Sequence, residues 1–341
     1  MSLGKKKMLS QGAAGGVVAT DNFNTVLYTG NGGTQAVTGV GFQPDFVWFK
    51  GRNNTNEHVL FDSVRGVGER IHTNTTDSEA STLPNGLTTF GSDGFTVVDN
   101  SGGGTGVNGN FNYVAWCWYL PTSESISASG SRLASTIKKN VDAGFSIVSY
   151  TGSTPNKTVG HGLSSPPELI IVKNRDVSGN GWATQSPYSG GADYHMMLNL
   201  TQEAKNNVDW IWNDTEPTSS VFSIGENSIS NGNGEKFIAY CFHSVAGYQK
   251  VGTYTGNGGA KSITGLGFTP RFVLFKCSST TGAWIILDSI RGSAVYLTAE
   301  SSAAEASTWF NFTFDSDGWS VNTNNNNVNG SGQTYIYLAI A

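Results

Sequence analysis

The sequence predicts an all-β protein of three tandem β-sandwich units, jelly-roll-like in kind, with an N-terminal arm in front of them. The first observation is repetition: residues 26–50 (VLYTGNGGTQAVTGVGFQPDFVWFK) return almost unchanged at 251–276, and an eroded copy stands at 148–173. The second is composition, because 44 glycines and 13% charged residues, against a usual charged share of about 25%, describe a chain rich in turns and poor in solvated helices. The third is the regular return of short apolar runs between Gly, Asn and Asp turns, which is typical of sandwiches and jelly rolls.

The N-terminal arm comprises residues 1–22. It is rich in Gly and Ala, has no apolar periodicity, and carries one basic cluster formed by Lys5, Lys6 and Lys7. Such a composition predicts a segment that does not become ordered by itself. We therefore expect an assembly arm whose lysines lie against another chain.

The first unit spans residues 23–120. Its strands are expected at 26–29, 35–38, 45–50, 58–62, 69–73, 86–90, 94–98 and 112–119. Pro44 stands six residues before Lys50, and the apolar run between them predicts a buried strand that the proline opens, since proline cannot donate to a ladder. Asp93-Gly94 predicts a hairpin turn, because glycine accepts the positive φ that such turns need. Residues 75–83 predict either a helical turn or a loop.

Residues 121–144 are rich in Ser and nearly free of aromatic residues, which predicts a linker. Within this segment, 132–141 could form a short helix or an extended strap over a neighbour. The second unit, 145–247, keeps the frame of the repeat but alone carries Trp210-Ile-Trp212. The third unit, 248–341, returns to the sequence of the first.

An Asp-x-x-Arg-Gly motif occurs twice, in units one and three. It places Asp62 beside Arg65, and Asp288 beside Arg291. Two interpretations are open: a grip on a charged ligand, or a local ion pair within a turn. The local pair is favoured, because a duplicated feature more often serves the fold than a site.

The cysteines, the histidines and the remaining paired aspartates predict no further catalytic or metal-binding site. Cys117 and Cys241 occupy matching positions where unit three has Ala339, which predicts small buried apolar positions and no disulfide framework. The pair Asp315 and Asp317 superficially resembles the start of a calcium loop, but the later ligands are missing and a hairpin turn is favoured. The histidines show no paired spacing, so we expect no metal, no cofactor and no enzymatic activity. A net charge of −5 argues against nucleic-acid binding, and no apolar run is long enough to insert into a membrane.

The tryptophans are the ambiguous candidates. Trp182 and Trp284 stand four residues before the Asp-Ser position of their units, where unit one has His58. Exposed indole rings beside amides and carboxylates suit the faces and hydroxyls of sugars, whereas buried ones would fill a core or a subunit interface. Burial in a core or an interface is favoured for the tryptophans, and sugar contact is the alternative. The candidate glycan or interface contacts are Trp182, Trp210, Trp212, Asn213, Asp214 and Trp284.

With the repeats laid out, the chain resembles a group of repeat-bearing structural proteins from tailed bacteriophages of marine and cyanobacterial hosts. The resemblance is carried by residues 4–16 (GKKKMLSQGAAGG), by the Tyr-Thr-Gly-Asn-Gly repeat opening at 28–32, by 113–118 (YVAWCW), by 143–152 and by 217–223. It covers essentially the whole chain and lends no catalytic residues. It implies a non-enzymatic virion component of the tail, fibre or baseplate.

The same resemblance implies a homo-oligomer. Because the N-terminal residues are too polar and Gly-rich for a signal peptide, synthesis in the cytoplasm of the bacterial host is expected. Its expected partners are other phage virion proteins and host surface polysaccharide, to which the particle would attach. Two alternatives remain open. One is a capsid decoration (cement) protein, and the other is a glycan-binding or glycan-cleaving protein.

Overall fold

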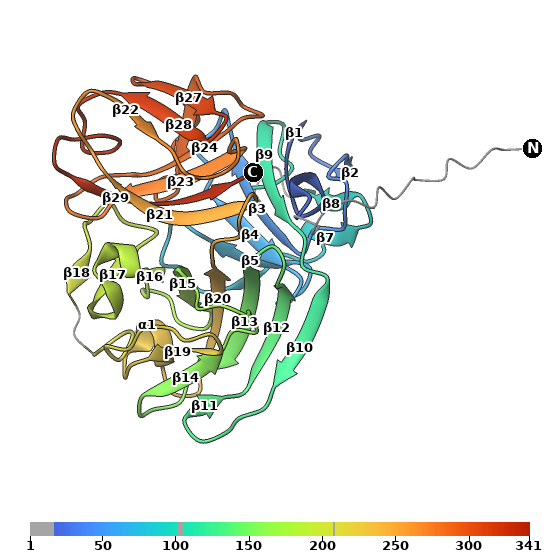
Figure 1. The fold of residues 1–341 in the computed structure, drawn as a ribbon. Helices are drawn as coiled ribbons and strands as arrows, with labels where there is room; N and C mark the ends of the chain where they lie inside the picture. The colour runs from blue at the N-terminus through green and yellow to red at the C-terminus, as the bar shows by residue number, and fades with distance from the viewer. Residues whose placement is uncertain (1–16, 101–105, 207–208) are drawn as a thin grey trace, which may run out of the picture.

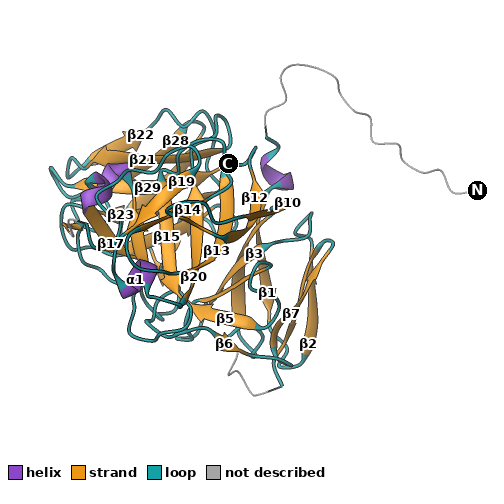
Figure 2. Cartoon of the chain, turned by 90° about the horizontal axis from the view of Figure 1, so that it is seen from below, coloured by secondary structure: helices purple, strands orange, loops and turns teal. Residues whose placement is uncertain are grey.

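Strands make up almost all of the regular secondary structure in this protein, whose computed structural model describes residues 17–100, 106–206 and 209–341. Figure 1 shows three groups of strands around one centre, blue for the first repeat, green to yellow for the second and orange to red for the third. Figure 2 shows how few and short the helices are beside the strands. The predicted all-β, sandwich-type fold is confirmed, because each repeat contains a large sheet and a second sheet of three strands.

Unit 1 has a large sheet in the order β1-β9-β3-β4-β5-β6 and a small sheet β2-β8-β7. Its elements are η1 (Ala19–Asp21), β1 (Phe23–Thr29), β2 (Thr34–Thr38), β3 (Phe46–Gly51), β4 (Val59–Asp62), β5 (Glu69–His72), β6 (Ala80–Ser81), β7 (Gly86–Gly91), β8 (Gly94–Val98) and β9 (Asn112–Trp118). Each of the eight strands expected from the sequence is present. The ambiguous segment 75–83 is a loop that contains the two-residue strand β6.

Unit 3 repeats this plan, with sheets β21-β29-β23-β24-β25-β26 and β22-β28-β27. Its strands are β21 (Gln249–Thr255), β22 (Ala260–Ile263), β23 (Phe272–Cys277), β24 (Trp284–Asp288), β25 (Val295–Thr298), β26 (Ala306–Ser307), β27 (Asn311–Asp315), β28 (Gly318–Asn322) and β29 (Thr334–Ile340).

Unit 2 has a larger main sheet, β10-β12-β13-β20-β15-β16-β17-β18, and a small sheet β11-β14-β19. Its strands are β10 (Thr122–Ile126), β11 (Arg132–Leu133), β12 (Ser135–Asn140), β13 (Phe145–Thr151), β14 (Lys157–Gly160), β15 (Leu169–Asn174), β16 (Ala183–Gln185), β17 (Tyr194–Met197), β18 (Lys205–Asn206), β19 (Val221–Ile224) and β20 (Lys236–Phe242). Its short helices are η2 (Pro187–Ser189), η3 (Gly191–Asp193) and α1 (Ser228–Asn231).

The segment 121–144 is therefore not a linker, which corrects the expectation from its composition. Strands β10 and β12 pair with each other, and β12 pairs with β13, so this segment extends the main sheet of unit 2. The outer end of a sheet needs few apolar residues. Here β10 is the edge strand, and on β12 beside it Ile137 is the one fully buried side chain with a large apolar group. The expectation of a strap over a neighbour is met in part, because Lys138 Nζ lies 2.9 Å from Asp45 Oδ1 of unit 1.

The hairpin turns before β8 and β28 use an Asp-Gly pair. Gly94 and Gly318 have φ of 148° and 147°, and a Cβ on either would lie about 2 Å from a carbonyl oxygen of the neighbouring strand. The Asp317 carboxylate accepts from the backbone N–H groups of Gly265 and Gly267, at 2.9 and 2.6 Å. These hydrogen bonds lower the pKa of Asp317. They account for this aspartate as part of the predicted hairpin turn.

The central strands β3, β15 and β23 are buried along their whole length. Each carries a lysine near its end: Lys50, Lys173 or Lys276, all without exposed surface. Each Nζ donates to the carbonyl of the following residue, at 2.6 to 2.8 Å. Burial lowers the pKa of all three lysines to about 8.

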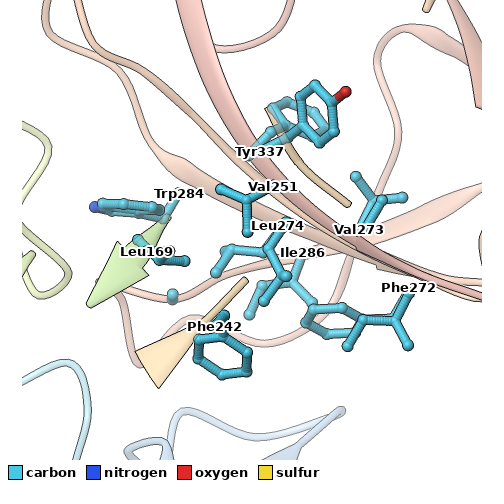
Figure 3. Packing of buried hydrophobic residues seen from close by; sticks show 14 of the residues in the cluster. Leu169, Phe242, Val251, Phe272, Val273, Leu274, Trp284, Ile286 and Tyr337 are labelled. Atoms are coloured by element: carbon cyan, nitrogen blue, oxygen red, sulfur yellow. The ribbon is translucent and has the colours of Figure 1, made fainter. Parts of the chain in front are cut away.

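The three main sheets meet in one shared apolar core. At its centre lies a cavity of about 20 Å³ to which all three units contribute, through residues such as Phe46, Tyr240 and Leu338. Figure 3 shows Leu169 and Phe242 of unit 2 beside Leu274, Ile286 and Trp284 of unit 3. The three units are thus packed as a closed ring, with three boundaries that we call 1–2, 2–3 and 3–1.

Candidate functional site

The Asp-x-x-Arg pair of unit 1 is buried, as the turn interpretation requires. Asp62 Oδ1 accepts from the backbone N–H of Arg65, and Asp62 Oδ2 accepts from Arg65 Nε at 2.6 Å. Neither side chain has exposed surface. Burial opposes the charge of this guanidinium, but Asp62 and Glu79 raise the pKa of Arg65 above its ordinary value.

The pair continues across boundary 1–2. Tyr240 of unit 2 donates to Asp62 Oδ2 at 2.8 Å, and Arg65 reaches Glu79, which in turn forms a two-pronged pair with Arg175 of unit 2 at 2.6 and 3.0 Å. We call these five side chains boundary cluster 1–2. Its two carboxylates and two guanidinium groups balance in charge, which is what allows the group to be buried.

The same arrangement recurs at boundary 3–1. Asp288 of unit 3 binds Arg291 and accepts from Trp116 Nε1 of unit 1 at 3.0 Å. Arg291 reaches Glu305, which pairs with Arg52 of unit 1 at 2.8 and 3.0 Å. The Arg291 guanidinium also lies 5.4 Å from the centre of the Trp116 ring. These five residues form boundary cluster 3–1.

Boundary 2–3 has lost the whole cluster. The main-chain contact survives, since Ala204 N–H donates to Ser278 O at 2.9 Å, as Glu79 N–H and Glu305 N–H donate at the other two boundaries. The side chains do not. The residues at the five equivalent positions are Ser186, Ser189, Ala204, Ser278 and Leu338. An isolated carboxylate or guanidinium would be costly here, so the charged residues are absent together.

A second set of contacts occurs at all three boundaries. Trp182 Nε1 donates to His72 O at 2.9 Å across boundary 1–2, and Trp284 Nε1 donates to Met197 O at 2.9 Å across boundary 2–3. The three acceptors, His72, Met197 and Thr298, are the last residues of the equivalent strands β5, β17 and β25. Each boundary is therefore closed by one ring N–H and one strand-end carbonyl.

His58 makes the equivalent contact at boundary 3–1. Its Nδ1 accepts from Trp48 Nε1 at 3.0 Å, so its Nε2 carries the proton and donates to Thr298 O at 3.1 Å. Burial, with a contribution from the charge of Lys50, lowers the pKa of His58. The neutral ring thus replaces an indole in the same role, which explains why His58 stands where the other units have Trp182 and Trp284.

The structure decides between the two interpretations for three of the candidate tryptophans. Trp182 and Trp284 are buried between the units of this chain, and Trp212 is buried in the core of unit 2. None of the three has an open face for a sugar ring. The interface interpretation applies to Trp182 and Trp284, with the contact lying within one chain.

Trp210 is different, because 64% of it is exposed. It lines an open pocket of about 460 Å³ together with Asn156, Asp209, Glu226 and Asn227. Asp209 is the neighbour of Trp210 in the sequence, whereas Asn156, Glu226 and Asn227 come from two other loops, and no spacing in the sequence brings these three to Trp210. The candidates Asn213 and Asp214 do not line this pocket, although Asn213 accepts a hydrogen bond from Asn156.

Several other expectations concern absences or lie outside the described residues. Lys5, Lys6 and Lys7 fall outside them. Among residues 17–100, 106–206 and 209–341, no group of three or more His, Cys, Asp or Glu side chains is placed to hold a metal ion. In the same part of the chain, no helix has the length and hydropathy to cross a membrane.

Comparison with known proteins gives one finding. Residues 18–341 match the family described as a domain of unknown function, DUF7483. The match takes in all three units, so the whole ring lies within one family domain. No curated protein is similar to the chain.

Proposed function

We propose that this chain, which belongs to the family DUF7483, is a non-enzymatic structural protein of a bacteriophage virion. It acts in or near the tail, as a fibre or baseplate component, and is made in the cytoplasm of the bacterial host. Its partners are further copies of itself and other virion proteins. Contact with polysaccharide on the host surface is part of the same role.

The closed ring is the observation that carries this proposal. Residues that recur in the sequence form the contacts between units. Examples are the pair Asp62 and Asp288 and the pair Trp182 and Trp284. Because these contacts fix the three units against one another, the sequences of the outer loops can vary without changing the shape of the protein. A particle component that presents loops to a partner needs such a rigid support.

The charge of the chain is consistent with this role. A net charge of −5 does not favour packing against the phosphates of a packaged genome, because such affinity comes from Lys and Arg. An outward-facing position on the particle is therefore part of the proposal. A capsid decoration protein would share this property, so it remains the alternative location.

Labelling of the particle tests the proposal. Purified virions are probed with antibodies to the three-unit body and viewed by electron microscopy, with particles of an unrelated phage as the control. Gold at the tail or baseplate is the expected result. Gold over the capsid surface would favour the decoration alternative, and a protein missing from purified virions would overturn the structural role.

A further inference from the structure

We propose that the Trp210 pocket binds a neutral saccharide, with one pyranose ring stacked on the exposed face of the indole. Hydroxyl groups of the sugar would bind the amides and carboxylates of Asn156, Asp209, Glu226 and Asn227, which line the same pocket. This site deepens the proposed contact with host polysaccharide and rests on the proposed function for its biological use. Binding itself is a property of the isolated chain.

The exposure of Trp210 is built into the structure. Its neighbours Ile211 and Trp212 are only 3% and 1% exposed, whereas Trp210 itself is 64% exposed. Two groups fix the backbone between them, because Gly225 N–H and Ser230 Oγ both donate to Ile211 O at 2.9 Å. The indole is therefore held outward by a loop whose other side chains are anchored.

Gly225 packs directly against the backbone of this loop. A Cβ at this position would lie 2.1 Å from Asp209 O and 2.3 Å from Trp210 O, both backbone atoms. Only glycine permits the loop to lie this close. On its far side the loop closes through Asn213, whose N–H donates to Asp209 O at 3.0 Å and whose φ of 52° lies in the left-handed region. A preset platform of this kind loses little conformational freedom on binding.

The polar groups of the pocket suit hydroxyls. Asn227 Oδ1 caps α1 by accepting from Ile229 N–H at 2.8 Å, which leaves its amide N–H groups to donate. Asn156 donates to Asn213 through Nδ2, so its carbonyl is left as an acceptor. Asp209 and Glu226 add carboxylate acceptors, and sugar hydroxyls both donate and accept. A volume of about 460 Å³ falls in the range of small-ligand sites.

The two carboxylates also set the class of sugar. Two negative charges in one pocket repel a uronic or sialic acid and leave neutral sugars as the ligands. The expected occupant is therefore a neutral hexose or an N-acetylated hexosamine within a host polysaccharide. Acidic polymers are excluded by the same residues that bind the neutral ones.

Trp309 provides a matched control. It is 44% exposed, on unit 3, but it packs against Phe310 with ring centres 4.8 Å apart, and its Nε1 lies 3.3 Å from the Tyr296 hydroxyl. It does not line the Trp210 pocket. Trp309→Ala also removes a partly exposed indole from the protein, and it leaves the Trp210 pocket intact.

The test is saturation-transfer NMR on the isolated full chain, with maltotriose, N,N′,N″-triacetylchitotriose and trigalacturonate as probes. Wild type and Trp309→Ala should give transfer to at least one neutral trisaccharide and none to trigalacturonate. Trp210→Ala should weaken that transfer by at least about tenfold, since stacking and most of the apolar contact are lost. Gly225→Val, which displaces the loop without touching the indole, should weaken it as well.

A charge variant tests the specificity separately. Asp209→Asn combined with Glu226→Gln keeps the shape of the pocket and should admit trigalacturonate. The proposal is overturned if wild type shows no transfer to either neutral probe at millimolar concentrations, or if Trp210→Ala and Trp309→Ala behave alike. Capture of a protein partner by Trp210 with no sugar transfer would likewise overturn it.

The outcome is separable from the fate of the virion role. Binding by the isolated chain with no protein in purified virions would keep the site and remove the proposed function. Location in the tail without sugar binding would keep the proposed function and remove the saccharide site. Release of reducing sugar from a bound probe would keep the site but overturn the non-enzymatic assignment.

Discussion

The hydroxyl of Tyr240 in unit 2 donates a hydrogen bond of 2.8 Å to the buried Oδ2 of Asp62 in unit 1. The same oxygen accepts from Arg65 Nε, so one carboxylate oxygen serves both its own unit and the next. Burial and the charge of Asp62 raise the pKa of Tyr240 well above its ordinary value, so this phenol remains protonated and able to donate. The first prediction follows from this contact.

Tyr240→Phe should lower the free energy of unfolding by about 1.5–3 kcal/mol, the range for hydrogen bonds to charged groups. Urea unfolding followed by tryptophan fluorescence measures the change. Tyr337→Phe is the control, because Tyr337 is also buried in a closing strand but makes no hydrogen bond through its hydroxyl among the described residues. Equal losses in the two variants would show that the Asp62 contact contributes nothing.

Asp62→Asn should cost more, about 3–5 kcal/mol, because it leaves Arg65 buried beside a neutral partner. Asp288→Asn should have a similar effect at boundary 3–1, where Arg291 is equally buried. Asp142→Asn, at an exposed position, is the control and should change the free energy of unfolding by less than about 0.5 kcal/mol. A cost below about 1 kcal/mol at both buried positions would contradict the role assigned to the clusters.

The buried lysines predict a pH dependence. The pKa of Lys276 is about 8 in the folded protein and near 10.4 in an unfolded chain. Between these values the unfolded state binds more protons, so the free energy of unfolding rises with pH, by up to about 1.4 kcal/mol per pH unit for each lysine.

The variant Lys276→Met isolates this effect. Comparison with wild type at pH 7.5, 8.5 and 9.5 cancels the opposing titration of buried thiols and phenols, which both proteins share. Wild type should gain stability relative to the variant as pH rises through this window. Lys236→Met, at an exposed position, is the control for substitution itself. A difference between wild type and Lys276→Met that is constant with pH would contradict the prediction.

The matching cysteines should tolerate alanine. Cys117 and Cys241 are free and fully buried, opposite Val47 and Ile170, where unit 3 places Ala339 opposite Val273. Cys117→Ala and Cys241→Ala should each lower the free energy of unfolding by about 1–2 kcal/mol at most. Burial raises the pKa of both thiols, so iodoacetamide should label them only after unfolding. Loss of folding under oxidising conditions would instead indicate a disulfide.

The strands of units 1 and 3 could be predicted because their signals are local. The run between Pro44 and Lys50, the Asp93-Gly94 turn and the alternation around them are all short-range patterns. The strand pair β10 and β12 could not be predicted because it forms the outer end of its sheet, with β10 at the edge. Its residues are mostly polar, so the sequence looks like a linker.

The candidate sites were also predictable only where the signal lies within a short stretch of sequence. Spacing alone placed His58 with Trp182 and Trp284, but it gave no sign that the three donate across boundaries, because their acceptors are backbone carbonyls in other units. Counting repeats does not say how the repeats are arranged in space. The Trp210 pocket could be predicted only in part. Its indole was a candidate from the sequence, but Asn156 and Glu226 lie beside it only because of the fold.

The missing cluster at boundary 2–3 has a consequence for how the ring is held together. Units 2 and 3 are joined covalently by residues 243–248, a tether so short that it keeps the two surfaces at a high effective concentration. No segment among the described residues links units 3 and 1 covalently, and boundary 3–1 retains its full set of charged side chains. A protease cut within 243–248 would therefore remove the tether from the boundary that relies on it most, and the ring should open there first.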